Sequence, residues 1–181
     1  MTIAVLTALA GAGSAPAAAL YSGSKMLEPG SNVEAVGSKI VFKAGFATLE
    51  CGRSEVIGTT ENTGSSTQAV TLSISSMALT ECSGTSNVLK KGAWIFHWAG
   101  ESNGTVTSEG WEWTIAFSGT SCTYGTPTAT DFGPLKGGSP ARLNMSAALT
   151  RVAGGFLCAN PATMTASYTF EEPNPLHVTA S

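Results

Sequence analysis

Apolar and polar residues alternate along most of the chain, a pattern typical of strands with one buried face and one face in water. The clearest run is residues 111–117, in which Trp111, Trp113, Ile115 and Phe117 are separated by small or polar residues. The same alternation predicts strands at 70–75, 143–149 and 164–170, and shorter runs predict strands at 40–42, 49–51, 56–57 and 94–98. No segment follows the helical period, so we expect no helix.

Turn-forming residues separate these runs at intervals of roughly ten residues. They are Asn62-Thr63-Gly64, Ser83-Gly84, Ser102-Asn103-Gly104, Glu109-Gly110 and Gly137-Gly138-Ser139-Pro140. We therefore expect an all-β fold, an antiparallel β-sandwich of about eight to ten strands, with a barrel as the alternative. Residues 126–140, rich in proline and glycine, are expected to form the one long irregular loop.

Residues 1–19 have a different character from the rest. Ile3, Val5 and Leu6 belong to an apolar stretch that ends in small residues, which resembles an export signal cleaved after Ala17 or Ala19. The basic start of such a signal is missing, so a retained N-terminal strand is the alternative. The stretch is too short to span a bilayer, and we expect no membrane span. The chain is thus divided into a leader, residues 1–19, and a single β-sandwich domain, residues 20–181.

Charge is scarce: 12% of residues are charged and the net charge is −3. Such a surface has no source of long-range attraction for nucleic acid, and we expect no nucleic-acid partner. The apolar content of 43% is high enough to argue against a disordered chain.

Four cysteines, Cys51, Cys82, Cys122 and Cys158, allow three disulfide pairings. We favour pairing in order, which closes two loops of similar length. A zinc site usually places cysteines in close pairs, and these four are widely spaced, so we expect no metal.

Six short segments carry a resemblance over most of the chain after the leader. They are Leu49-Glu50-Cys51, Leu79-Thr80-Glu81-Cys82, Cys122-Thr123-Tyr124-Gly125, Phe156-Leu157-Cys158, Ala166-Ser167-Tyr168-Thr169 and Pro175-Leu176-His177-Val178. Together they resemble exported actinobacterial β-rich proteins of unknown function with four such cysteine positions. The resemblance implies secretion, paired cysteines and a sandwich fold, and it supplies no catalytic residues.

Residues for nucleophilic catalysis are few. A Ser-His-Asp triad would have to use His97 or His177 with Asp131, the one aspartate of the chain. The G-x-S-x-G turn that presents a nucleophilic serine is absent from the sequence. His97 lies in an aromatic strand, so a structural role is favoured.

Acidic residues offer another route to chemistry. Glu101, Glu109 and Glu112 cluster around one predicted hairpin, and paired carboxylates cleave glycosidic bonds. Their places in turns and on a polar face favour solvated surface charge instead. Glu171, Glu172 and Asp131 are too dispersed in the sequence to form a calcium cage.

The tryptophans Trp94, Trp98, Trp111 and Trp113 occupy two predicted strands. Exposed on a sheet, they would form a platform on which a sugar could stack; buried, they would form core. Their alternation with polar residues favours the core.

These observations favour a non-catalytic structural or assembly protein, secreted or held at a bacterial cell envelope, with no catalytic residue and no cofactor. Its partner would be another copy of itself, in a homo-oligomer or filament, or a cell-surface glycan. Unpaired strand edges and a retained segment 2–10 could add strands between copies. The alternatives are a carbohydrate-binding module that uses the tryptophans and a glycan-directed hydrolase.

Overall fold

The computed structural model describes residues 18–117 and 119–181, and in these residues it contains twelve strands and no helix. The strands are β1 (Ala19–Ser22), β2 (Lys25–Met26), β3 (Asn32–Ala44), β4 (Ala47–Thr60), β5 (Val70–Cys82), β6 (Thr85–Gly100), β7 (Asn103–Phe117), β8 (Thr120–Gly125), β9 (Thr130–Lys136), β10 (Arg142–Ala153), β11 (Ala162–Glu172) and β12 (His177–Thr179).

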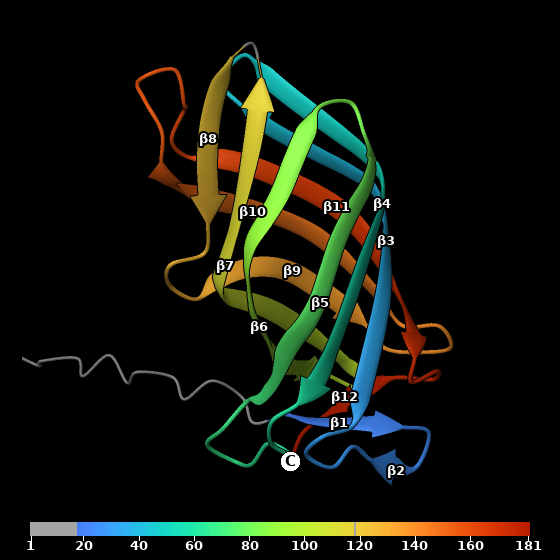
Figure 1. Ribbon diagram of the computed structural model, residues 1–181. Coiled ribbons are helices and arrows are strands. Elements are labelled where there is room, and N and C mark those ends of the chain that lie inside the picture. The colour runs from blue at the N-terminus through green and yellow to red at the C-terminus, as the bar shows by residue number, and fades with distance from the viewer. Residues whose placement is uncertain (1–17, 118) are drawn as a thin grey trace, which may run out of the picture.

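Strands β3 to β11 form one antiparallel sheet that closes on itself (Figure 1). From β3 to β8 each strand pairs with the next along the chain, β9 pairs with β10 and β10 with β11, and β11 returns to pair with β3. β8 pairs with one half of β7 and β9 with the other half, and both also pair with β10. The two short strands therefore share one position, and the sheet is an eight-stranded barrel.

The all-β antiparallel class predicted from the alternation is confirmed, and the closed form is the barrel given as the alternative. The sandwich describes it only in part. Opposite walls of the barrel face one another across a single core, as the two sheets of a sandwich do. The β11–β3 ladder, however, joins the walls into one continuous sheet.

Two local predictions are wrong, because glycine and proline are accommodated within strands here. Residues 126–140 contain β9, in which Gly133 has a positive φ of 117° and marks a break in the register with β7. The predicted turn at Glu109-Gly110 lies inside β7, where Gly110 faces Gly92 of β6 and both have positive φ. Paired glycines of this kind let two strands bend together without a turn.

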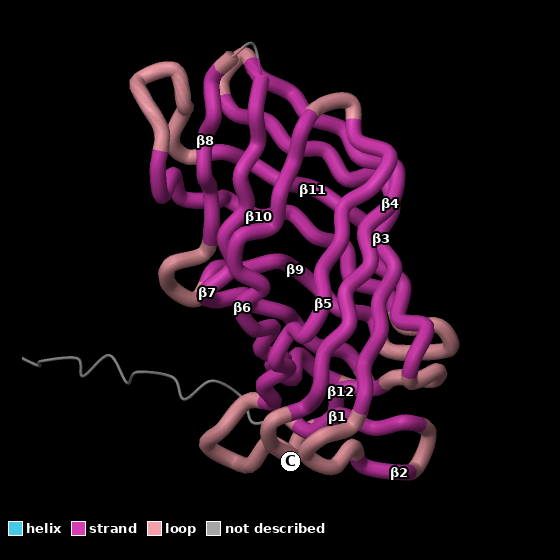
Figure 2. The backbone as a smooth tube through the Cα atoms, in the orientation of Figure 1, coloured by secondary structure: helices cyan, strands magenta, loops and turns pink. Residues whose placement is uncertain are grey.

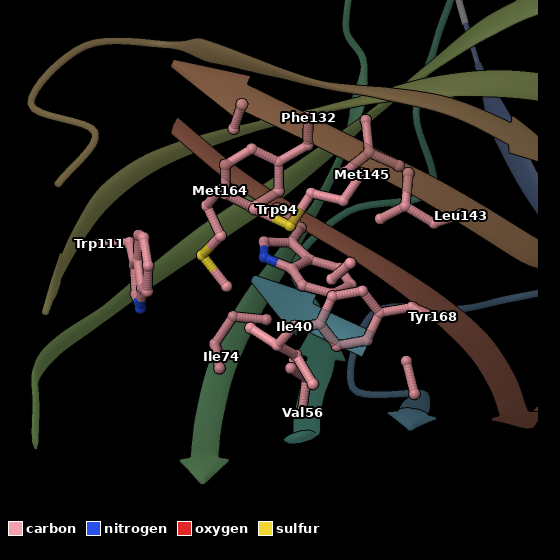
Figure 3. Close-up of a cluster of buried hydrophobic side chains, with 14 of the residues drawn as sticks. Ile40, Val56, Ile74, Trp94, Trp111, Phe132, Leu143, Met145, Met164 and Tyr168 are labelled. Atoms are coloured by element: carbon pink, nitrogen blue, oxygen red, sulfur yellow. The ribbon is translucent and has the colours of Figure 1, made fainter. Parts of the chain in front are cut away.

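The inward faces of the strands form one hydrophobic core (Figure 3). Large aromatic side chains fill its centre: the ring centroid of Trp94 is 5.3 Å from that of Tyr168 and 6.1 Å from that of Phe132. Met145 and Met164 fill the space between them, as flexible methionine side chains commonly do. The outward positions are mainly serine, threonine and charged residues, which gives the alternation seen in the sequence.

Loops and turns gather at the two ends of the barrel (Figure 2). One end is covered by a small sheet in which β1 pairs with both β2 and β12, and Leu20 and Val178 of that sheet are fully buried. Ala18 and Ala19 are also buried there. The rest of the predicted leader, residues 1–17, lies outside the described residues.

Both disulfides pair in order along the chain, as predicted. Cys51–Cys82 joins directly opposed residues of β4 and β5, and Cys122–Cys158 ties β8 to the loop between β10 and β11. In the described part of the chain, no helix has the length and apolarity needed to cross a membrane.

Candidate functional site

The end of the barrel opposite the small sheet combines tight anchoring with exposed apolar side chains. We call it the apolar end and define it by the turns 45–46 and 83–84, the loop 154–161 and the ends of the strands that enter them. The loop 154–161 folds toward the turn 45–46, since a Cβ built at Gly45 would lie 3.2 Å from the Cβ of Ala159. The apolar end is therefore one connected surface.

Arg151 fixes the loop from inside the barrel wall. It continues the inward-facing series of β10 and lies opposite Tyr124 of β8 in the ladder. Its Nη1 donates hydrogen bonds to the carbonyl oxygens of Gly155 (3.1 Å) and Cys158 (2.6 Å), and its backbone N–H donates to Asn160 Oδ1 (3.0 Å). With the Cys122–Cys158 disulfide, these bonds hold the loop against β10 and β8 at this end of the barrel.

Tyr124, the ladder partner of Arg151, has a fully buried ring. Burial raises the pKa of its phenol, and the positive charge of Arg151 partly opposes that rise. Its hydroxyl has no partner among the described residues, and neither do the indole N–H groups of Trp111 and Trp113. Three buried polar atoms in the described part of the chain therefore have no hydrogen-bond partner.

Four large apolar side chains project from the apolar end. Phe156 is 92% exposed and Phe46 is 73% exposed, and Leu157 and Val152 are each more than one-third exposed. The ring of Phe46 rests edge-on against Phe117 of β7, with centroids 5.9 Å apart. A cavity of about 360 Å³ opens beside it, between the start of β4, the turn 83–84 and the end of β7, and Leu49, Ile115 and Phe117 line it.

The four tryptophans do not form a surface platform. Trp94, Trp111 and Trp113 are almost fully buried, and the rings of Trp111 and Trp113 stack inside the barrel. Trp98 alone keeps part of its ring in solvent, and its Nε1 donates a hydrogen bond to the carbonyl oxygen of Glu101. Only Trp98 is therefore accessible for stacking on a sugar.

The histidine and aspartate candidates are only partly brought together. His97 Nε2 lies 3.2 Å from Thr107 Oγ1, and Thr107 faces Asp131 in the β7–β9 ladder. Desolvation lowers the pKa of His97, against the opposing charge of Asp131. Asp131, however, accepts a hydrogen bond from the backbone N–H of Gly133, and none joins it to His97 in the described structure. His177 belongs to β12 of the small sheet, where it lies opposite Tyr21 of β1.

The glutamates of the predicted hairpin do not form a carboxylate pair. Glu112 makes an ion pair with Lys90 of the neighbouring strand, with N and O 2.6 Å apart. Glu109 and Glu101 are exposed, Glu101 in the turn between β6 and β7. Among the described residues, no group of three or more histidine, cysteine or acidic side chains could hold a metal ion.

A second surface feature is a seam between β5 and β6. These long strands pair only from Val70↔Phe96 to Ser73↔Ala93 and then diverge until the turn 83–84 joins them (Figure 1). A groove lined by Met77, Ala78 and Leu79 on one side and by Ser86, Asn87 and Val88 on the other lies between them. Lys91 Nζ donates a hydrogen bond across the seam to the carbonyl oxygen of Ser75.

The apolar end was not expected from the sequence. The available signal was a large apolar residue inside a turn, Phe46 after Gly45 and Phe156 after Gly154-Gly155. Such residues can equally fold back into a core, so the sequence alone does not reveal their exposure. Comparison of the chain with protein-family models, curated proteins and solved structures finds no match.

Proposed function

We propose that this protein is a non-catalytic structural protein, secreted or held at the cell envelope. The observation that carries the proposal is the filled barrel. Aromatic and aliphatic side chains occupy its interior, the small sheet covers one end, and a disulfide ties a loop to β8 at the other end. A barrel of this kind keeps its shape while its outer surface and ends make contacts, which suits a rigid building block.

The disulfides support the exported location. Disulfides persist in oxidising compartments and are rare in the cytosol. Two of them, with no free cysteine in the described residues, fit a protein that folds outside the cytoplasm. The signal-like pattern of residues 1–17 fits the same route.

The seam supports self-assembly. Unpaired strand edges accept a strand from another chain through backbone hydrogen bonds. Beyond the Ser75 carbonyl that Lys91 covers, the edge of β5 from Ser76 to Thr80 contains no charged residue and no proline, the usual protections of an exposed edge. A neighbouring copy could therefore pair at this edge.

Light scattering after size-exclusion chromatography, over a range of protein concentrations, tests the proposal. We expect the average mass to rise with concentration. Ala78→Lys places a charge in the groove and should return the protein to a monomer, whereas Thr163→Lys on the exposed face of β11 should not.

A monomer at every concentration would contradict self-assembly. Hydrolysis of a glycan substrate that is lost in Glu112→Gln would contradict the non-catalytic role and favour the hydrolase.

A further inference from the structure

The exposed apolar side chains are distributed very unevenly. In the described part of the chain five large apolar side chains are exposed, and four of them, Phe46, Val152, Phe156 and Leu157, lie at the apolar end. The fifth, Leu89, lies on the wall of the barrel in β6. We propose that the apolar end inserts into the interfacial layer of a lipid bilayer, so that the barrel stands on a membrane; the inference rests on the proposed envelope role.

The loops at this end can enter an apolar medium without desolvating a charge. The turns 45–46 and 83–84 and the loop 154–161 contain no charged residue. Behind them, the charged side chains nearest in sequence on the entering strands are Lys43, Glu50, Glu81 and Arg151. The Arg151 guanidinium already donates to two loop carbonyls. Moving an unpaired charge into an apolar medium is costly, so insertion should stop at the depth of the loops.

The size of the surface favours lipid over a protein partner. Taking about 150 to 250 Å² for an aromatic side chain, the exposed parts of the four side chains amount to roughly 500 Å². A stable protein interface takes about 800 Å² from each partner. A bilayer can surround each projecting side chain separately, and aromatic residues favour its interfacial layer.

The loops are also held in place before any contact with lipid. The Cys122–Cys158 disulfide and Arg151 fix the loop that carries Phe156, and Phe117 supports Phe46. Little conformational entropy remains to be lost on insertion, and pre-ordering of this kind raises affinity.

Sedimentation with phosphatidylcholine vesicles tests the inference, with the disulfide-bonded protein as purified. We expect the wild type to sediment with the vesicles. Phe156→Ala and Phe46→Ala should each weaken partitioning about tenfold, because each removes an apolar side chain from the buried surface. Leu89→Ala is the matched control and should change partitioning less than twofold. Because apolar contacts rather than charges drive the insertion, 1 M NaCl should not weaken binding to the vesicles.

A second readout locates the contact. When vesicles are added to Phe156→Trp, the fluorescence emission of the added indole should shift to the blue, and brominated phosphatidylcholine should quench it. The added indole of Leu89→Trp should show neither effect.

Three results would overturn the inference: no wild-type sedimentation, equal losses in Leu89→Ala and Phe156→Ala, or a Phe156→Ala defect confined to oligomer size. A protein that fails to bind vesicles but fractionates with the cell envelope would overturn this inference alone. A monomer found free in the medium and unable to bind vesicles would overturn the proposed envelope role as well.

Discussion

Tyr168 of β11 shows how one side chain connects three strands. Its ring lies over Gly37 of β3, and its hydroxyl donates a hydrogen bond to Ser54 Oγ of β4 at 3.1 Å. These residues are register partners, Tyr168 with Gly37 and Gly37 with Ser54. A tyrosine can span the middle strand only because glycine leaves room there, so the pair fixes the register at the β11–β3 closure.

Replacement of Gly37 with alanine should therefore weaken the barrel. The new Cβ would lie 2.6 Å from Tyr168 Cε1, closer than packed atoms approach. We expect a loss of about 1 to 3 kcal/mol in the free energy of unfolding, the usual cost of overpacking. Chemical denaturation measures it. Gly155→Ala, where a Cβ meets nothing within 4 Å, is the control and should change stability little.

The same tyrosine should make the fold sensitive to alkali. Burial raises the pKa of Tyr168 from 10.0 to about 12, although the hydrogen bond with Ser54 works against the rise. Below pH 10 the folded and unfolded chains both keep the phenol proton. Between about pH 10 and 12 the unfolded chain loses it first, so the free energy of unfolding should fall by up to about 2 to 3 kcal/mol.

Denaturation at pH 9, 10.5 and 11.5 tests this dependence. Tyr168→Phe should lose stability at pH 9 and show a shallower decline above pH 10. An equally steep decline in the variant would assign the effect to other groups.

Among the elements, the loop 154–161 depends most on its covalent anchor. Cys51–Cys82 joins strands that a hydrogen-bonded ladder already holds together, whereas Cys122–Cys158 holds a segment with no ladder of its own. Loss of either bridge should lower stability by about 2 to 5 kcal/mol. Only the second loss should free the loop.

Limited digestion with chymotrypsin distinguishes the two bridges. The digestion is done under conditions in which both double variants remain folded. The variant with Cys122→Ala and Cys158→Ala should be cut rapidly after Phe156 or Leu157. The variant with Cys51→Ala and Cys82→Ala should resist cutting at these sites. Equal cutting in both variants would show that the Cys122–Cys158 disulfide does not anchor the loop.

At the scale of the whole molecule, the end of the barrel that the small sheet covers limits where a leader can be removed. Ala18 and Ala19 are buried, and Ala19 pairs with Thr179 in the β1–β12 ladder. Removal after Ala19 would delete both residues from this packing, whereas removal after Ala17 would leave it intact. We therefore expect the exported protein to begin at Ala18.

The intact mass of the protein from its native host, without reduction, tests this expectation. It should equal that of residues 18–181 less four hydrogens, for two disulfides. A chain that begins at Leu20 would show that the β1 contacts are dispensable, and a chain that keeps residues 1–17 would favour the retained strand.

The sequence by itself determined which residues face inward, because alternation is a property of neighbouring side chains on a strand. Residues 111–117 and 164–170 follow the predicted alternation, and the preferred in-order cysteine pairing is the one observed. Only the tertiary structure decided the closure, since β3 and β11 are joined by hydrogen bonds between residues far apart in sequence. It also decided the exposure of Phe46 and Phe156, because the packing of separate loops, rather than local pattern, leaves those rings in solvent.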